Sequence, residues 1–149
     1  MKSDPPSSPS RTRILVCDDE KLIRTRVRAI LQEVPFFEIV GEAADSASAV
    51  KLAAELRPDV VLMDVSMPGM DGIEATRQIV SHSPGVRVLA FSSDSSPSTV
   101  RQMLAAGARG FLLKSGHTGE LIAGIIQIST GDSFFSPASI DPAHKPPPD

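Results

Sequence analysis

Acidic side chains stand where they could handle a metal ion or a phosphoryl group. Asp18 and Asp19 follow the apolar run Ile14–Cys17, and Asp64 follows the apolar run Val60–Met63. Carboxylate oxygens suit Mg²⁺, which usually also keeps water and substrate phosphate as ligands. A carboxylate can itself be the nucleophile and carry an aspartyl phosphate. These residues predict Mg²⁺-dependent phosphoryl chemistry, with Asp64 as the nucleophile because it ends its run just before a Met-Pro-Gly turn.

Two further polar side chains end apolar runs in the same way. Ser92 follows Val86–Phe91, and Lys114 follows Phe111–Leu113. In phosphoryl transfer the protein mainly positions groups and neutralises charge on the phosphoryl oxygens. Mg²⁺, the Lys114 ammonium and the Ser92 hydroxyl can each take one of those oxygens. Ser92 is preferred over Ser93 because it follows its apolar run directly.

Each of these features has a simpler explanation when taken alone. An acidic pair before a helix often only caps the helix and favours its dipole. A lysine at the end of a strand is usually a solvated charge, and the serine-rich stretch Ser92–Ser98 resembles a polar loop. Only their joint occurrence, each at the end of an apolar run, favours a site over these explanations.

The elements that must position these side chains follow from two alternating patterns. The short runs, together with a weaker one at Glu38–Ala43, are typical of strands, and longer segments with helical spacing separate them. Strands apolar on both faces predict a parallel sheet covered by helices, and the carboxyl ends of such strands share one edge. The apolar helical stripes comprise Leu22, Ile23, Val27, Ile30, Leu31 and Val34; Ile73, Ile79 and Val80; and Leu121, Ile122, Ile125, Ile126 and Ile128.

Helix starts are predicted at two further places. Asp71 and Glu74 have the spacing of a capping box. Ser96 followed by Pro97 suits an N-cap with proline at the first helical position. Both starts lie shortly after a predicted strand, so they agree with the alternating pattern.

Length and composition favour one domain. The chain has 149 residues, and its net charge of −3 argues against a surface built throughout for nucleic acid or membrane. We expect a Pro/Ser-rich disordered tail at 1–10, a folded domain at 11–137, and a Pro-rich tail or start of a linker at 138–149. The single Cys17 excludes an internal disulfide, and no signal peptide or apolar span is present. A cytoplasmic location is the default expectation.

Three segments together, Leu15–Glu20, Leu62–Gly72 and Gly107–Lys114, resemble the receiver domain of two-component response regulators. The resemblance covers roughly residues 12 to 131. It implies a flavodoxin-like α/β fold, with a doubly wound, five-stranded parallel sheet in strand order 2-1-3-4-5. The end of the third segment, with Gly131–Asp132 and Ser136–Pro137, looks like the subfamily that carries a LuxR-type helix-turn-helix output, which these residues do not include.

The resemblance also implies a role for each acidic residue. Asp64 would accept the phosphoryl group from the phosphohistidine of a sensor histidine kinase. Asp19 would bind Mg²⁺ directly, and Asp18 would act mainly through a coordinated water. The backbone carbonyl of Ser66 would be a further ligand, with Asp64 itself completing the set.

The remaining implied roles concern the response to phosphorylation. Lys114 would pair with the phosphoryl group, and Ser92 would move to bond it. Phe111 stands where the family places its aromatic switch residue, although an aromatic at the start of a strand is usually plain core. We further hypothesise that Ser66 and Asp94 tune the phosphoryl lifetime, because both would flank the path of an attacking water.

The sequence leaves three alternatives, and the first is whether the chain is a receiver domain or a phosphohydrolase. The resemblance implies a domain that catalyses only its own phosphorylation and dephosphorylation, and is not an enzyme. A Mg²⁺-dependent phosphohydrolase with an aspartate nucleophile uses similar residues. The pattern typical of such enzymes, however, is an Asp-x-Asp pair after the first strand. Here the first two carboxylates are adjacent, and the chain has no cap domain.

The second alternative concerns the output of the domain. The third concerns the role of the last helical segment. The chain either belongs to a transcription factor that meets DNA through a missing domain, or acts alone through protein contacts, with a homodimer on phosphorylation as one option. No nucleic-acid or membrane contact is expected from this segment itself. The wide apolar arc of the last helix, with Gly124 in it, predicts either an output surface or deeper burial on the sheet.

Overall fold

The computed structural model describes residues 11–67, 69, 71–94 and 96–135. Strands and helices alternate along the chain, as the two hydrophobic patterns predict. The strands are β1 (Thr12–Cys17), β2 (Phe37–Ala43), β3 (Val60–Asp64), β4 (Arg87–Ser92), β5 (Gly110–Leu113) and β6 (Phe134–Phe135). The helices are α1 (Lys21–Leu31), α2 (Ser46–Leu56), α3 (Gly72–His82), α4 (Pro97–Ala106) and α5 (Thr118–Ser129).

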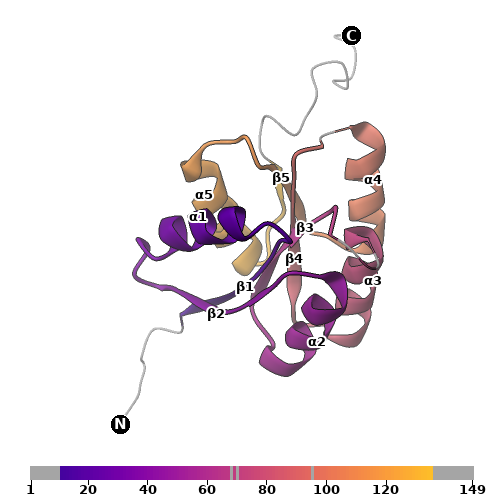
Figure 1. The fold of residues 1–149 in the computed structure, drawn as a ribbon, viewed down its shortest axis with the longest axis horizontal. Helices are drawn as coiled ribbons and strands as arrows, with labels where there is room; N and C mark the ends of the chain where they lie inside the picture. Colours follow the sequence, from indigo (N-terminus) through magenta and orange to yellow (C-terminus); the bar gives the residue numbers. More distant parts are fainter. Residues whose placement is uncertain (1–10, 68, 70, 95, 136–149) are drawn as a thin grey trace.

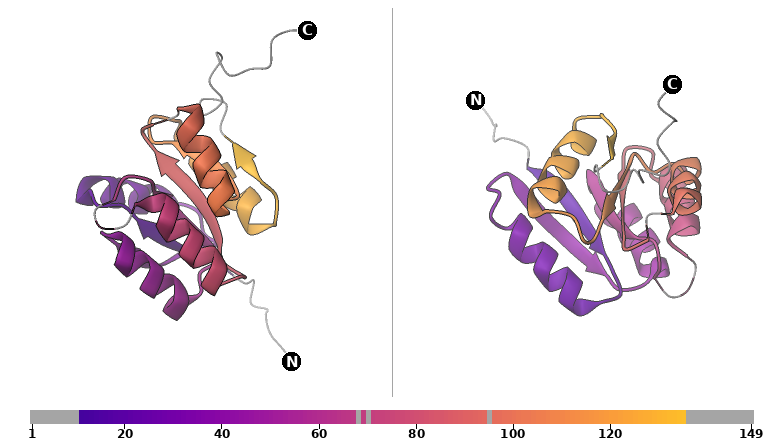
Figure 2. Two further views of the ribbon diagram at one scale, coloured as in Figure 1. Left: turned by 90° about the vertical axis from the view of Figure 1, so that its right-hand side faces the viewer. Right: turned by 90° about the horizontal axis from the view of Figure 1, so that it is seen from above.

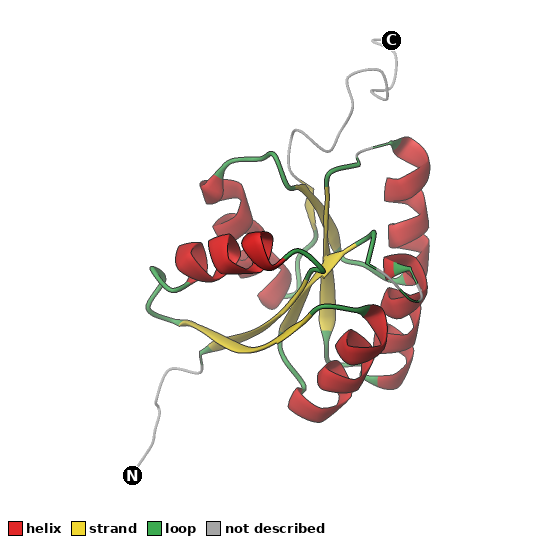
Figure 3. Cartoon of the chain, viewed as in Figure 1, coloured by secondary structure: helices red, strands yellow, loops and turns green. Residues whose placement is uncertain are grey.

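The strands form one parallel sheet between two layers of helices (Figures 1 and 3). Helices α1 and α5 cover one face, and α2, α3 and α4 lie side by side on the other (Figures 1 and 2). The strand order is β2-β1-β3-β4-β5-β6, so the chain winds outward from β1 in both directions. This is the flavodoxin-like receiver architecture, and it gathers the carboxyl ends of the strands at one edge.

Each face of the sheet has its own hydrophobic core, which explains why the strands show no polar alternation. Leu15 and Cys17 of β1 point into the core shared with α2, α3 and α4. Ile14 and Val16 point to the opposite face, where α1 and α5 pack. Successive side chains of a strand alternate in direction, so a strand buried on both faces must be apolar throughout.

The expectation of five strands is wrong by one, because a short sixth strand extends the sheet. Phe134 and Phe135 pair in parallel with β5 after Gly131, whose φ of 100° turns the chain back. Gly110 permits the close approach, since a Cβ there would lie 2.2 Å from the Phe134 carbonyl oxygen. Two residues are too few to show any periodicity, and the order of the other five strands is as predicted.

The wide apolar arc of α5 is explained by burial on the sheet. Leu121, Ile125 and Ile128 lie in the core beneath α1 and α5. At Gly124, an added Cβ would lie 3.0 Å from Phe134 Cδ2, so the glycine marks close packing against β6. The arc is wider than five strands require because it also covers the sixth.

The two predicted helix starts are confirmed. The Asp71 side chain accepts a hydrogen bond from the Glu74 amide (2.8 Å), and Ser96 caps α4 by accepting from the Thr99 amide (3.3 Å). Helix α1 differs, because its N-cap Glu20 makes no capping hydrogen bond with its side chain. The loop before α1, which carries two of the acidic residues, must therefore be held by other contacts.

The predicted tails at 1–10 and 138–149 lie outside the described residues. Within the described part of the chain, no helix is both long and apolar enough to cross a membrane.

Candidate functional site

Four polar residues lie at the carboxyl edge of the sheet. Asp18 directly follows β1, Asp64 and Ser92 end β3 and β4, and Lys114 directly follows β5. These strands are consecutive neighbours in the sheet, so residues far apart in sequence are brought together. The backbone connects two of them, because the Lys114 amide donates to the Ser92 carbonyl (2.9 Å).

Three carboxylates form an acidic cluster at this edge. One oxygen each from Asp18, Asp19 and Asp64 lies within 4.8 Å of the other two. Asp18 and Asp64 are only 1% and 3% exposed, whereas Asp19 is exposed. Carboxylates held this close repel one another, and an all-oxygen donor set selects a hard cation. The residues present therefore fit Mg²⁺, with the exposed Asp19 on the solvent side of the cluster.

Lys114 forms ion pairs with two carboxylates of this cluster. Its Nζ lies 2.8 Å from Asp18 Oδ2 and 3.3 Å from Asp64 Oδ1, and 5.8 Å from the centre of the Phe91 ring. Burial opposes the charged form, but the bond to Asp18 and the charges of Asp64 and Asp18 outweigh burial and raise the Lys114 pKa. The ammonium is therefore firmly protonated beside the carboxylates.

Opposing influences act on the carboxyl group of Asp64. Burial raises its pKa and the charge of Asp18 adds to this, while the Ser66 amide and Lys114 act in the opposite direction. The Ser66 amide donates to Asp64 Oδ1 at 3.1 Å. An added Cβ at Gly72 would lie 2.6 Å from the Asp64 carbonyl oxygen, so the start of α3 packs tightly on the end of β3.

The hydroxyl of Ser92 is bonded to the backbone of Asp94. It donates to the Asp94 carbonyl (3.1 Å) and accepts from the Asp94 amide (2.9 Å). The Asp94 carboxylate points to the start of α4, where it accepts from the Ser96 amide and the Thr99 hydroxyl, each at 2.8 Å. The bond from the Ser96 amide, followed by that from Thr99, lowers the Asp94 pKa. Ser92 is 1% exposed and Ser93 is exposed, and the contact of Ser92 with a phosphoryl oxygen stays a prediction.

Phe111 is fully buried in the core beneath α2, α3 and α4. This placement suits a plain core residue, and the role of switch residue stays a prediction. Cys17 lies in the same core, where burial and then the charges of Asp18 and Asp64 raise the pKa of its thiol. It is a small neutral core residue beside the site.

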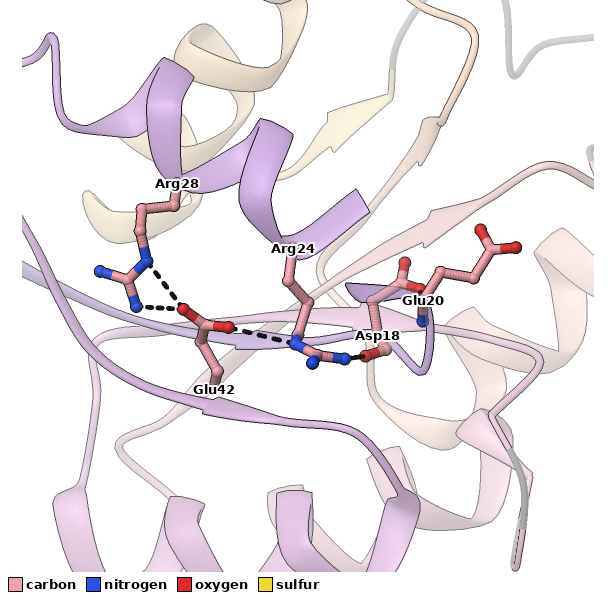
Figure 4. Close-up of polar contacts among 5 residues, drawn as sticks. All are labelled: Asp18, Glu20, Arg24, Arg28 and Glu42. Atoms are coloured by element: carbon pink, nitrogen blue, oxygen red, sulfur yellow. Dashed lines mark hydrogen bonds and ion pairs between the residues drawn. The ribbon is translucent and has the colours of Figure 1, made fainter. Parts of the chain in front are cut away.

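One group of residues near the site was not found from the sequence. Arg24 and Arg28 of α1 lie on either side of Glu42 of β2, and Arg24 also reaches the Asp18 carbonyl (Figure 4). The spacing of four residues places both arginines on one side of the helix. Their partner could not be read from the sequence, because it depends on β2 lying next to β1.

The chain is similar to known proteins along most of its length. The response regulator receiver domain family matches residues 14–126. The response regulator GacA of Pseudomonas viridiflava is 37% identical over 125 residues, which cover 84% of this chain and 58% of that protein. The probable transcriptional regulatory protein NarL of Mycobacterium tuberculosis is 36% identical over 132 residues, covering 89% and 61%.

Solved structures agree with this similarity. A two-component response regulator of the LuxR family from Aurantimonas sp. SI85-9A1 superposes with a TM-score of 0.83 at 35% identity, covering 87% of this chain and 93% of that one. The signal receiver domain of NarL from Mycobacterium tuberculosis gives 0.80 at 37% identity, covering 83% and 99%. The chain spans little more than half the length of curated relatives such as GacA. From its sequence, fold and site, the chain belongs to the response regulator receiver domain family.

Proposed function

We propose that Asp64 accepts a phosphoryl group from the phosphohistidine of a sensor histidine kinase. The observation that carries this proposal is the Lys114 ammonium, 2.8 Å and 3.3 Å from the buried carboxylates of Asp18 and Asp64. An ammonium and two buried carboxylates at the carboxyl edge of a parallel sheet supply a nucleophile, a counter-charge and metal ligands together. The site would hold Mg²⁺ through Asp18, Asp19, Asp64 and the Ser66 backbone carbonyl.

The chemistry assigns one task to each side chain. An oxygen of Asp64 bonds to phosphorus as the phosphorus–nitrogen bond of the phosphohistidine breaks. Lys114 neutralises charge on one phosphoryl oxygen, and Mg²⁺ held by the acidic residues would supply further positive charge to the phosphoryl group. The phosphoryl group ends on the protein itself, so the domain turns over no external substrate. It catalyses only its own phosphorylation and dephosphorylation.

The response to phosphorylation begins at Ser92. Its hydroxyl donates to the Asp94 carbonyl, and this bond must open before the hydroxyl can donate to a phosphoryl oxygen, because a hydroxyl has one proton to donate. Such an exchange of hydrogen-bond partners gives the β4–α4 loop two arrangements, and the phosphoryl charge favours one of them. Phe111 would adjust with this loop, and Ser66 and Asp94 would set the lifetime of the phosphoryl group.

The output is inferred from the relatives. GacA is a response regulator, and DegU and LiaR are transcriptional regulatory proteins that extend well beyond the matched region. We therefore propose that the domain regulates transcription through a DNA-binding domain outside these residues, in the cytoplasm, with a homodimer on phosphorylation as one route. The described segment itself would contact the kinase and protein partners, and neither DNA nor membrane.

Intact-mass measurement after incubation with acetyl phosphate and Mg²⁺ tests the central claim. We expect one adduct of about 80 Da on the wild-type chain. Asp64→Asn should abolish the adduct, whereas Asp132→Asn, a control at an exposed aspartate, should retain it. Absence of the adduct from the wild-type chain, or its persistence in Asp64→Asn, would contradict the proposal.

A further inference from the structure

The loop that carries Asp18 and Asp19 leads into a helix without a side-chain cap. Glu20, the N-cap of α1, makes no capping hydrogen bond through its side chain, and the first turn of α1 contains no acidic residue. The Glu20 amide instead donates to Asp18 Oδ1 (3.0 Å). The direction of the exposed Asp19 therefore depends on how the peptide that joins it to Asp18 is held.

Arg24 holds that peptide. Its Nη1 donates to the Asp18 carbonyl oxygen at 2.7 Å, and its Nε donates to Glu42 Oε1 at 3.1 Å (Figure 4). On the other side of the same residue, the Asp18 amide donates to the Ala43 carbonyl (3.0 Å). Glu42 and Ala43 are the last two residues of β2, so the Asp18 backbone is fixed to β2 both directly and through Arg24.

The atom of Asp18 to which Arg24 bonds matters for the metal ligands. A guanidinium bonded to a carboxylate of the cluster would compete with a bound cation for that oxygen. At Asp18, Arg24 bonds to the backbone carbonyl and not to the carboxylate, whose Oδ1 accepts from the Glu20 amide and whose Oδ2 pairs with Lys114. Arg24 therefore does not occupy a carboxylate oxygen that a metal could bind. Its charge is compensated by Glu42, whose second oxygen accepts from Arg28 Nε (2.8 Å). The Arg24 side chain is 16% exposed, whereas the Glu42 and Arg28 side chains are 28% and 41% exposed, so Arg24 is the most shielded member of this arrangement.

We propose that Arg24, anchored by Glu42, is a positioning residue of the acidic site. It sets the orientation of the peptide between Asp18 and Asp19, and through it the affinity of the site for Mg²⁺. The inference rests on the proposed function only in taking Mg²⁺ as the ion. Groups that orient metal ligands from outside the coordination shell commonly change metal affinity when they are removed.

Charge and positioning predict opposite effects of removing Arg24. Loss of a positive charge beside three carboxylates favours cation binding by Coulomb attraction alone, so Mg²⁺ would bind more tightly. Loss of the bond to the Asp18 carbonyl releases the ligand loop, so Mg²⁺ would bind less tightly. Arg28 offers a matched control because it also pairs with Glu42. Unlike that of Arg24, its side chain has no bond to Asp18 among the described contacts.

Isothermal titration calorimetry with MgCl₂ on the full chain distinguishes the charge effect from the positioning effect. Arg24→Met should weaken Mg²⁺ binding roughly tenfold, the lower end of the effect typical of such outer groups. Arg28→Met should keep the wild-type affinity or exceed it. Affinity at or above wild type in Arg24→Met, or an equal loss in Arg28→Met, overturns the inference.

A second variant and the behaviour of the wild-type chain complete the test. If Arg24→Met fails to fold by circular dichroism, Arg24→Lys takes its place, because it keeps the positive charge and loses the planar fork that bonds the Asp18 carbonyl and Glu42 together. Weaker Mg²⁺ binding by Arg24→Lys supports the positioning role, and unchanged binding overturns it. Absence of Mg²⁺ binding by the wild-type chain would overturn the proposed metal site itself. Mg²⁺ binding by wild type without phosphorylation of Asp64 would contradict the proposed function and leave the positioning role of Arg24 supported or overturned by its own variants.

Discussion

Lys114 Nζ lies 2.8 Å from Asp18 Oδ2, and the two side chains are 14% and 1% exposed. A nearly buried carboxylate thus has an ammonium from a different strand end as its ionic partner. The same carboxylate belongs to the cluster that fits a divalent cation. Lys114 is therefore a resident counter-charge, whose importance for stability should depend on whether Mg²⁺ is present.

Replacing Lys114 with Met should destabilise the metal-free protein by about 3 kcal/mol, because it leaves a buried charge unpaired. Saturating Mg²⁺ should recover part of this loss, because a cation bound by the folded state replaces the missing positive charge beside Asp18 and Asp64. Urea unfolding followed by circular dichroism, with and without Mg²⁺, measures both effects. Lys51→Met, at an exposed lysine of α2, is the control and should change neither value. Wild-type stability of Lys114→Met without Mg²⁺ would show that the pair is unimportant.

Replacing Asp94 with Ala should change the rate at which the phosphorylated chain loses its adduct, measured by intact mass over time. The structure directs the Asp94 carboxylate to Ser96 and Thr99, so the residue can act through its charge or through the loop. Thr99→Val separates these routes, because it removes one bond and keeps the charge. A lifetime changed only by Asp94→Ala indicates the charge, and equal changes indicate the loop. An unchanged lifetime in Asp94→Ala would exclude this residue from tuning.

Gly72→Ala should destabilise the fold by about 2 kcal/mol, within the range for inserting a methyl group into packed space. The added Cβ would lie 2.6 Å from the Asp64 carbonyl oxygen and 2.7 Å from the Val65 Cα, both backbone atoms. Because the clash falls on the end of β3, phosphorylation of Asp64 should slow as well. Gly119→Ala in α5 has no atom within 4 Å of the new Cβ and should be neutral or stabilising. Equal stability of the two variants would contradict this account of Gly72.

Acid should weaken the folded state partly through Glu42. The hydrogen bond from Arg28, followed by the charge of Arg28 and the contacts with Arg24, lowers the Glu42 pKa despite partial burial. A lowered pKa contributes stability above the unfolded value of about 4.3, and this contribution is lost as the pH falls through the folded value. Stability should therefore fall less steeply below about pH 5 in Glu42→Gln than in wild type. Glu38→Gln, at an exposed position of the same strand, should keep the wild-type slope.

The sequence alone predicts the chemistry of the site because its residues follow a simple rule. Asp18, Asp64, Ser92 and Lys114 each end or directly follow an apolar run, and parallel strands must bring such positions to one edge. The same local logic predicts the caps at Asp71 and Ser96. These features depend on periodicity and on neighbours along the chain, which a sequence displays directly.

Tertiary structure alone decided what depends on neighbours across the sheet. Strand β6 forms because Gly110 lets Phe134 approach β5, and two residues carry no periodic signal. The direction of the Asp94 carboxylate depends on the start of α4. Arg24 meets both Glu42 and the Asp18 carbonyl only because β2 lies beside β1. The sequence determined which groups reach the site, and packing between distant segments decided how each group is held there.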